Sequence, residues 1–425
     1  MIDVALSEGY AGATIARVIS EAGVSRPTFY DYFTDKDDCF LAALAEIHER
    51  VLAEIRQAVA GQAPQHASDA AIGVLVGFAS SHAPLARLLM NESMAAGPRA
   101  LDARDQGIAE IEQTIGEAYG RLSSATAIPD LSGRMMLGGI YRLLAARLRR
   151  SEPCGAGLLD EVLDWVNSYE QPAGEHRWRM LTPAPGFSPS PLLPKTPMRP
   201  PPALAPGRTR LSKEEVSENH RIRILFAATQ VAQEKGYTAT TIADITSIAG
   251  VDRRVFGALF ADKQDVFMTI IHEFGFQGMM GVAAGAFAYF AVASWPERVW
   301  EAGRAAGQFL RDNPSITHVG AVEAYAVGPG AINRLDELAI AFTIFLQQGY
   351  EYARKSHSPS RVALEAIGAT SFELCYLQAR TSESRDLLGL LPHSTHLALA
   401  PFLGASEANR FIEEKLAEEK MNAQP

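Results

Sequence analysis

Apolar side chains recur along this chain at helical spacing, and runs that alternate with period two, as in a strand, are scarce. Ala and Leu are abundant, which also favours helices. The pattern therefore predicts an all-α protein. Beyond the two repeated segments described below, helices are expected near Asp69 to Asn91, Leu101 to Leu122, Ser132 to Arg150, Leu158 to Tyr169, Pro296 to Arg311, Ile332 to Tyr352, Ser360 to Arg380 and Thr395 to Glu419.

Residues 14–33 combine two helical patterns with a turn between them. The apolar positions of 14–22 share one face of a helix, and Gly23 suits the left-handed residue that ends it. Ser25 is placed to cap a second helix, whose first turn tolerates Pro27 because the missing N–H needs no partner there. The segment therefore predicts a helix-turn-helix.

The second of these helices has an inner apolar side and an outer polar side. Phe29 and Phe33 are four residues apart and are expected to point into the core. Polar and aromatic side chains occupy the other faces, namely Arg26, Thr28, Tyr30 and Tyr32. Such a helix can present its outer face to a groove of DNA.

The whole pattern returns in the second half of the chain. Gly9-Tyr10 reappears as Gly236-Tyr237, and with this offset of 227 positions held fixed, half of the 32 positions from Gly9 to Phe40 are identical. Chance does not produce such a match without insertions or deletions, so the chain carries an internal repeat. The identical positions include Arg26, Phe29, Phe33 and Lys36, which match Arg253, Phe256, Phe260 and Lys263.

A segment of different composition lies between the two copies. Residues 171–211 hold 11 of the 24 prolines, so they cannot form a helix or a central strand and are expected to be extended. We interpret the segment as a linker, with docking of a partner on the prolines as the alternative. The expected division is a head at 1–47, a helical body at 48–170, the linker at 171–211, a second head at 212–274 and a second body at 275–425.

Composition narrows the functional classes. A length of 425 residues with a hydrophobic fraction of 47% fits two or more globular domains. Three cysteines at unrelated positions offer neither a disulfide framework nor a zinc site, and the chain shows no phosphate-binding loop, hydrolase elbow or zinc-protease motif. No catalytic residue, metal site or cofactor is therefore expected. The net charge of −10 argues against indiscriminate binding to nucleic acids, but it permits a local DNA-facing surface.

Two features bear on the cellular setting. The N-terminal residues lack the pattern of a signal peptide, so a reducing, cytoplasmic setting is expected. The segment Phe274 to Pro296 has no charged residue and is long enough to cross a bilayer. It is rich in Gly and Ala rather than Leu and Ile, so we expect buried helices there and no membrane contact.

The two repeated segments resemble the DNA-binding head of the tetracycline-repressor (TetR) family of transcription regulators. The resemblance covers about 45 residues in each copy, and it implies two tandem units, each a three-helix head with a helical ligand-binding and dimerisation body. In the first copy it rests on Gly9-Tyr10, Thr14-Ile15, Ala22-Gly23-Val24-Ser25, Thr28-Phe29-Tyr30-Asp31-Tyr32-Phe33 and Lys36-Asp37-Asp38.

The resemblance implies contacts with an operator in double-stranded DNA. Arg26, Pro27 and Thr28 would open the recognition helix and face base edges or nearby phosphates, while the hydroxyls of Tyr30 and Tyr32 would donate to phosphate oxygens. Further contacts are implied for Thr14, Ser25 and Lys36 in the first head and for Thr241, Arg253, Arg254 and Lys263 in the second.

Each copy departs from the family pattern in a different place. Only eight residues precede Gly9, where the family has a longer first helix, so either the true start lies upstream or the head is shortened. The second copy has that helix in full, but Gly257 and Leu259 stand where Tyr30 and Tyr32 stand in the first. The second head is therefore expected to bind weakly, to read a different half-site, or not to bind.

The family also implies an unidentified small-molecule inducer among the body helices and a four-helix dimer interface built by the last long helices. Residues 132–169 occupy that place in the first copy, and Ser360 to Arg380 with the C-terminal helix occupy it in the second. Two copies in one chain allow an intramolecular pseudo-dimer or a homodimer of whole chains. We expect a ligand-responsive regulator of bacterial type, a repressor, with a ligand-sensing or protein-interaction module that has lost DNA binding as the alternative.

Overall fold

The computed structural model describes residues 1–63, 66–120, 133–169, 198–204, 211–353, 358–380 and 387–422. Every regular element among these residues is a helix, which confirms the all-α prediction. The linker predicted at 171–211 lies outside the described residues except for 198–204 and Leu211, and so do the predicted helix ends at Leu122 and Ser132.

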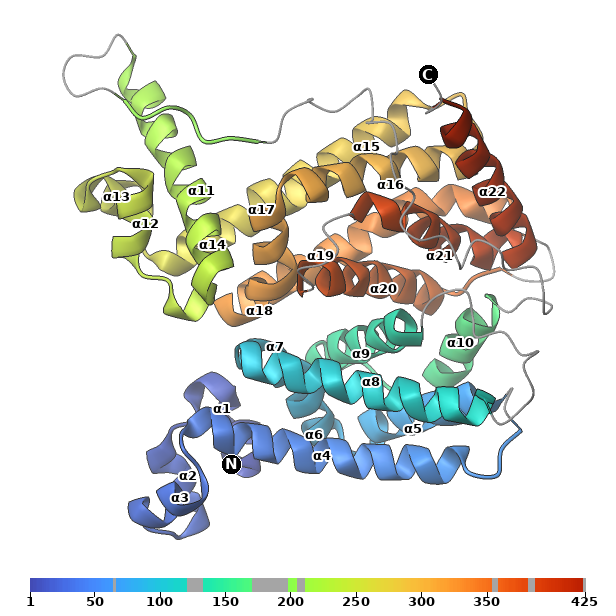
Figure 1. The fold of residues 1–425 in the computed structure, drawn as a ribbon, viewed down its shortest axis with the longest axis horizontal. Coiled ribbons are helices and arrows are strands. Elements are labelled where there is room, and N and C mark those ends of the chain that lie inside the picture. The colour runs from blue at the N-terminus through green and yellow to red at the C-terminus, as the bar shows by residue number, and fades with distance from the viewer. Residues whose placement is uncertain are drawn as a thin grey trace. The chain divides into compact units, whose positions relative to one another are not determined.

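Three short helices and the start of a fourth form the first head (Figure 1). They are α1 (Ile2–Gly12), α2 (Ile15–Ala22), α3 (Arg26–Tyr32) and α4 (Lys36–Val59). Their buried core contains Val18, Phe29 and Cys39, and Phe33 is half-buried against it. The predicted inward placement of Phe29 and Phe33 is therefore confirmed.

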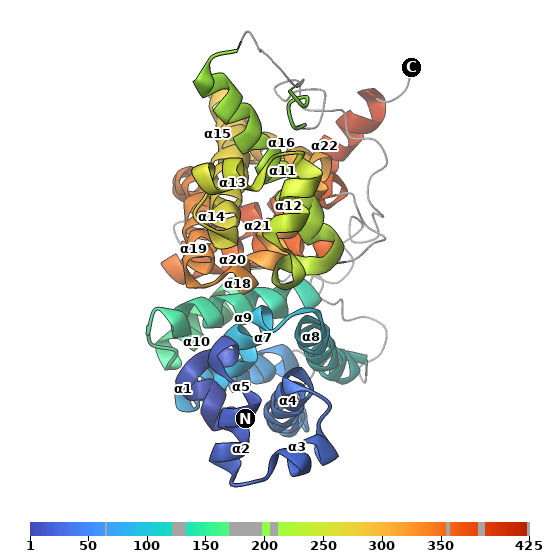
Figure 2. The same ribbon diagram turned by 90° about the vertical axis from the view of Figure 1, so that its left-hand side faces the viewer.

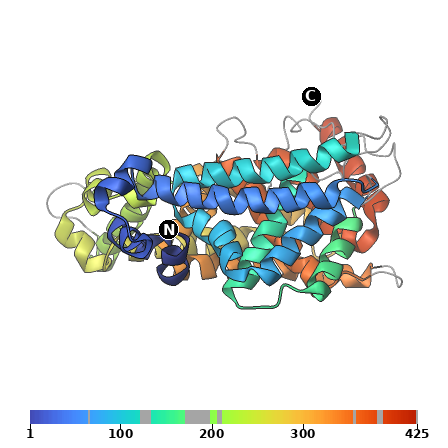
Figure 3. The same ribbon diagram turned by 90° about the horizontal axis from the view of Figure 1, so that it is seen from below.

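The first copy continues as a body of helices in which α4 also takes part. The start of α4 closes the head, whereas Val51, Leu52 and Ile55 further along it are fully buried in the body. Figure 3 shows α4 and α8 running side by side. The body helices are α5 (Ala67–Ser81), α6 (Ala83–Arg87), the π-helix η2 (Leu88–Glu92), α7 (Ser93–Ala95), α8 (Pro98–Gly120), α9 (Gly133–Arg149) and α10 (Ala156–Asn167).

The second head is built on the long helix α11 (Lys213–Ala239), which begins at a capping box of Ser212 and Glu215. Figure 2 shows α12 (Ile242–Ala249), α13 (Arg253–Leu259) and α14 (Lys263–Ile270) gathered around it. The helices that follow are η4 (Ile271–Met279), α15 (Met280–Tyr289), α16 (Trp295–Asp312), α17 (Pro314–His318), the π-helix η5 (Val319–Glu323), α18 (Ala324–Val327), α19 (Pro329–Phe342) and η6 (Thr343–Glu351).

The last helices of the second copy are α20 (Arg361–Arg380), η7 (Leu387–Leu390), α21 (Leu391–Leu403) and α22 (Ala405–Asn422). The chain divides into two compact units whose limits differ from those of the sequence repeat. Unit 1 consists of Met1–Leu181, Leu346–Glu373 and His396–Glu413, and unit 2 consists of Thr182–Phe345, Leu374–Thr395 and Glu414–Pro425. Unit 1 is therefore completed by parts of α20, α21 and α22.

The uncharged segment Phe274 to Pro296 forms part of η4, α15 and the start of α16. Ala283 and Ala286 are buried, but Tyr289 is 67% exposed and Val292 is fully exposed. The expectation of buried helices is therefore correct for only one side of α15. Within the described residues, no single helix meets the length and hydropathy of a membrane span, although the bent pair Ala67–Ser81 and Ala83–Ala95 does so when taken together.

Candidate nucleic-acid interface

Local hydrogen bonds fix the helix-turn-helix of the first head. The Thr14 hydroxyl accepts from the backbone N–H of Arg17 at 3.3 Å and caps α2. Gly23 ends that helix with φ 65° and ψ 29°, a left-handed conformation that favours glycine. The Ser25 hydroxyl accepts from the N–H of Thr28 at 3.2 Å and caps α3. The roles predicted for Gly23 and Ser25 are therefore confirmed, and Thr14 is a further cap.

The outer face of α3 carries the side chains predicted to meet DNA. Tyr32 is 78% exposed and Tyr30 is 48% exposed, whereas Phe29 on the opposite side is buried. Arg26 is exposed too, and its guanidinium lies 6.0 Å from the centre of the Tyr30 ring. Thr28 is half-buried, and its hydroxyl lies 2.8 Å from that of Ser25. One cation and two phenol hydroxyls are thus presented together.

The Gly9-Tyr10 pair of the first head is held at both of its peptide groups. The Tyr10 N–H donates to Glu92 Oε2 at 2.7 Å, and the Tyr10 carbonyl accepts from Lys36 Nζ at 3.1 Å. Lys36 Nζ also lies 3.9 Å from the centre of the Tyr10 ring. Gly9 has φ 71°, which permits the kink that exposes these groups. Because Glu92 ends the body π-helix η2, this contact joins head to body.

The second head repeats the arrangement. The Tyr237 N–H donates to Glu323 Oε2 at 2.6 Å, and the Tyr237 carbonyl accepts from Lys263 Nζ at 2.8 Å. Glu323 ends the π-helix η5, and Gly236 has φ 79°. Burial lowers the pKa of the Lys263 ammonium, as expected for a cation packed against its own domain. We call this arrangement of Tyr, Lys and Glu in each copy the Gly-Tyr clamp.

Sequence reasoning missed the carboxylates of the Gly-Tyr clamp. A signal was present, because Glu92 and Glu323 each begin the pattern Glu-x-x-Ala-x-Gly-Pro, at 92–98 and again at 323–329. The repeat therefore extends beyond the heads, with a slightly longer offset. The clamp also changes the role of Lys36 and Lys263, whose ammonium groups are engaged with a tyrosine in the same head rather than turned outward.

Removing the Glu92 carboxylate tests the clamp. A hydrogen bond to a charged group contributes about 1.5–3 kcal/mol, and the half-buried position of Glu92 reduces the expected loss in Glu92→Ala to about 1–2 kcal/mol. Local opening around Tyr10 then becomes easier, so its amide should exchange about 5- to 30-fold faster, measured by hydrogen–deuterium exchange. Glu92→Gln keeps an acceptor oxygen and should retain most of the protection. Equal acceleration in both variants would contradict the proposed contact.

The recognition helix of the second head differs in its contact chemistry. Asp252 caps α13 by accepting from the Arg254 N–H at 2.7 Å, and Arg253 and Arg254 are exposed. A Cβ built on Gly257 would meet no atom within 4 Å, so the position of Tyr30 is empty here. The position of Tyr32 is taken by the half-buried Leu259. The α13 face therefore has two cations but no phenol hydroxyl.

The two heads also differ at the start of the preceding helix. In the first head, Arg17 lies in the first turn of α2 and pairs with Glu8, with Nε at 2.8 Å from Oε1. The matching ion pair in the second head has reversed polarity, since Lys235 Nζ lies 2.6 Å from Asp244 Oδ2. The Thr241 hydroxyl donates to the same carboxylate. Lys235 and then Thr241 lower the pKa of Asp244 to about 2, so this group is anionic at neutral pH.

This reversal matters for phosphate binding, and sequence reasoning missed it. A helix N-terminus attracts anions, and an arginine in the first turn strengthens that attraction. An ionised aspartate at the same place repels a phosphate and occupies the Thr241 hydroxyl that was predicted to contact DNA. The signal was the matched pair Arg17 and Asp244 in the repeat. The charge at this helix N-terminus therefore differs in sign between the two heads, and each charged group is paired within its own head.

Comparison with known families agrees with the repeat. A family model described as "Bacterial regulatory proteins, tetR family" matches residues 3–43 and, a second time, residues 224–270. Each match spans one helix-turn-helix head. No curated protein matches the chain at a significant level. Among the described residues, no group of three or more His, Cys, Asp or Glu side chains is placed to hold a metal ion.

Proposed function

We propose that this chain, whose two heads match the tetR-family model, is a ligand-responsive repressor that reads its operator chiefly through α3 of the first head. The observation that carries the proposal is the outer face of α3, where Arg26, Tyr30 and Tyr32 are exposed together. The family consists of DNA-binding transcriptional regulators that dimerise and bind small ligands, which supports this function rather than catalysis.

The proposed contacts follow from what each side chain can donate. Arg26 and Thr28, with Pro27 between them, lie in the first turn of α3 and are assigned to base edges and nearby phosphates. Tyr30 and Tyr32 are assigned to phosphate oxygens, which fix register without reading sequence. The capping residues Thr14 and Ser25 and the cation Arg17 add to the phosphate surface. Lys36 is assigned to the Gly-Tyr clamp, where it positions the head.

The second head is proposed to contribute little affinity. Its candidates are Arg253 and Arg254, which are exposed, while Thr241 is bonded to Asp244 and Lys263 to Tyr237. Because Thr241 and Lys263 are bonded within the second head, the alternative function, a module that has lost DNA binding, is favoured for that head but not for the first. We propose that the two heads act as an intramolecular pair, so that one chain reads an asymmetric site.

Selection of binding sites from a random double-stranded DNA library with the full-length chain tests the proposal. We expect enrichment of a defined sequence, and absence of any enriched sequence would refute the DNA-reading function. In Arg26→Ala, the base preference at one or two positions of the site is expected to weaken. The free energy of binding should become less favourable by about 1–3 kcal/mol. Arg253→Ala is the matched control in the second head and should change the selected sequence less than Arg26→Ala does.

The sign of regulation is tested separately. The selected site is placed over the promoter of a reporter gene, and the full-length chain is expected to lower expression. Higher expression would identify an activator and would leave the DNA-reading proposal intact.

A further inference from the structure

Two helices that are far apart in the sequence meet closely inside unit 1. A Cβ built on Gly139 of α9 would lie 2.0 Å from Thr370 Oγ1 and 3.0 Å from Thr370 Cα. A Cβ on Gly138 would lie 2.4 Å from Glu373 Cγ. Only the absence of a side chain at both glycines allows α9 of the first copy and α20 of the second to approach in this way. The two surfaces are therefore matched in shape.

The same contact contains a fully buried carboxylate that is neutralised by the first copy. Glu373 accepts from Arg104 through two bonds, at 3.0 Å to Oε1 and 2.8 Å to Oε2. Arg142 Nε donates to Oε2 at 2.6 Å. Burial acts to raise the pKa of Glu373, but the charges of Arg104 and Arg142 outweigh it and leave the pKa below its ordinary value. The acid comes from α20, and both cations come from the first copy.

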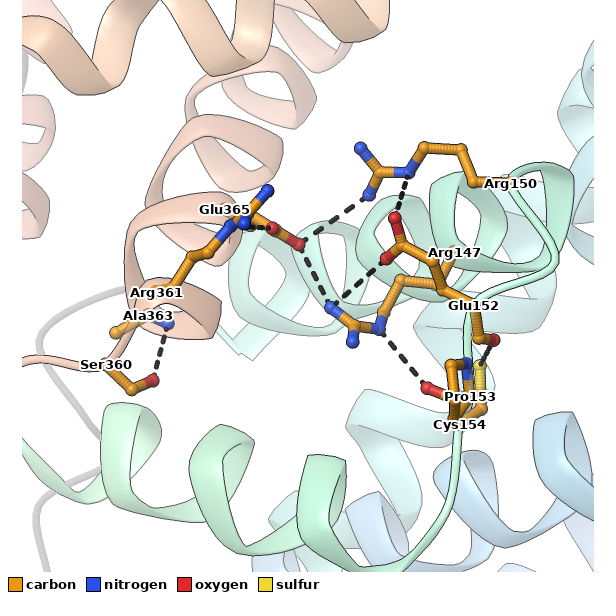
Figure 4. A network of polar contacts seen from close by, with 9 residues as sticks. All are labelled: Arg147, Arg150, Glu152, Pro153, Cys154, Ser360, Arg361, Ala363 and Glu365. Atoms are coloured by element: carbon orange, nitrogen blue, oxygen red, sulfur yellow. Dashed lines mark hydrogen bonds and ion pairs between the residues drawn. The ribbon is translucent and has the colours of Figure 1, made fainter.

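A second cluster repeats this division of charge nearer the surface (Figure 4). Glu365 Oε2 of α20 lies 3.1 Å from Arg147 Nη1 and 3.6 Å from Arg150 Nη2. Glu152 also pairs with Arg150, at 3.1 Å, so an acid of the first copy neutralises part of the charge of its arginines. Arg361 of α20 pairs with Glu365 at 3.2 Å, but its side chain is 85% exposed. The buried side of this cluster again joins arginines of the first copy to an acid of the second.

The C-terminal end of α10 makes a third contact with the second copy. The Tyr169 hydroxyl donates to the Leu397 carbonyl of α21 at 2.8 Å and accepts from Trp165 Nε1 at 2.9 Å. All three groups are buried. This single hydrogen bond joins α21 to the residues that follow α10, and its two polar groups would be left unpaired if the contact opened.

We propose that the α9–α20 contact selects its partner by charge, so that the first copy pairs with the second copy of the same chain and not with another first copy. The arginines Arg104, Arg142, Arg147 and Arg150 form the cationic half of this interface, and Glu365 and Glu373 form the anionic half. The inference deepens the intramolecular pairing in the proposed function, but it does not depend on DNA binding.

Like pairings are disfavoured by the same charges. The helix α9 contains four arginines and no Asp or Glu, so two α9 helices packed together would oppose cations to cations. Two α20 helices packed together would leave Glu373 buried without its two guanidinium groups. A buried charge that loses its partner is strongly destabilising. The interface thus favours the unlike pair and penalises both like pairs, which is how specificity between similar surfaces arises.

Charge reversal in the full-length chain tests this pairing. Arg147→Glu and Glu365→Arg are each expected to lower the midpoint of thermal unfolding by about 2–8 °C, and the double reversal should lose less than the sum, although Glu152, Arg150 and Arg361 then face like charges. The reversals Arg334→Glu and Glu337→Arg provide a matched control at an exposed pair in unit 2, where the coupling should be near zero. Additive losses at Arg147 and Glu365 would overturn the inference.

The mass of the chain decides whether the pairing is intramolecular. Light scattering at micromolar concentration is expected to give about 45.9 kDa for the wild type. A mass near twice that value would overturn pairing within one chain. Neither measurement involves DNA, so failure to bind an operator would leave these outcomes unaffected, and their failure would not by itself remove DNA reading by α3.

Discussion

Replacing Glu373 with alanine is expected to lower the free energy of unfolding of unit 1 by about 3–5 kcal/mol. The carboxylate is fully buried and bonded to two arginines that are themselves almost buried, with side-chain exposures of 3% for Arg104 and 9% for Arg142. Without it, both cations remain in the interior with too little compensation. For a unit of this size the midpoint of thermal unfolding should fall by about 6–20 °C, as measured by calorimetry.

Two controls separate the charge effect from loss of packing. Glu365→Ala removes a less buried acid from the same helix and should cost no more than about 1 kcal/mol. Replacing the buried group, as Arg104→Met, Arg142→Leu and Glu373→Leu together, should restore most of the lost stability, because no fully buried charge remains and Asp105, which loses Arg104, is partly exposed. If the triple variant is as unstable as Glu373→Ala, the electrostatic explanation is wrong.

The pH dependence of the same site follows from the lowered pKa of Glu373. A carboxyl group whose pKa is lower in the folded state contributes stability above its unfolded value, and this contribution is lost as the pH falls through the folded value. The unfolded value for Glu is about 4.3. The difference in stability between the wild type and Glu373→Gln should therefore be constant near neutral pH and shrink as the pH falls below about 4.

The combined variant Tyr30→Phe and Tyr32→Phe is expected to weaken operator binding by about 2–3 kcal/mol, or about 30- to 150-fold. Both hydroxyls are exposed on α3, so their loss should leave the unfolding midpoint unchanged. Phosphate contacts position the head without reading bases, so specific and non-specific DNA should lose affinity by the same factor. Titration of the selected site and of an unrelated duplex at fixed salt measures both.

The salt dependence distinguishes tyrosines from arginines. Because a phenol is uncharged, the double phenylalanine variant should keep the wild-type slope of log affinity against log salt concentration. Arg26→Ala should reduce this slope by about one, the value for one lost phosphate contact.

The reverse experiment introduces the missing hydroxyls into the second head as Gly257→Tyr with Leu259→Tyr. Because Asp244 remains, we expect less than about a tenfold gain, and a larger gain would contradict the repulsion assigned to that carboxylate.

Much of each head could be predicted from the sequence because its rules are local. Thr14, Gly23 and Ser25 act on backbone groups within a few residues, so residue type and spacing are enough to place them. The inward Phe29 and outward Tyr30 follow from helical periodicity in the same way. The internal repeat allowed the two heads to be compared position by position, and this comparison showed that Gly257 and Leu259 replace the two tyrosines of the first head.

Roles that could not be predicted from the sequence depend on partners far away in the chain. From its residue type, Lys36 is predicted to be a cation available to phosphate. In the structure, the kink at Gly9 places the Tyr10 carbonyl where it accepts a hydrogen bond from Lys36 Nζ. Glu92 is separated from Tyr10 by 82 positions, and although its motif recurs at Glu323, no local rule shows that this carboxylate contacts the head. The ion pairs at Arg17 and Asp244 are different, because both partners lie nine residues apart and the reversal of charge is already visible at matched positions of the repeat.

By itself, the sequence determined the helical character of the described residues, the two segments that match the tetR-family model, and the residues that cap and line each recognition helix. Only the tertiary structure decided that Arg104 and Arg142 meet Glu373, separated from it by 269 and 231 positions. The reason is physical. Caps and helix faces are set by hydrogen bonds and periodicity over a few residues, whereas the choice among distant charged partners depends on which helices can approach closely enough to bury them.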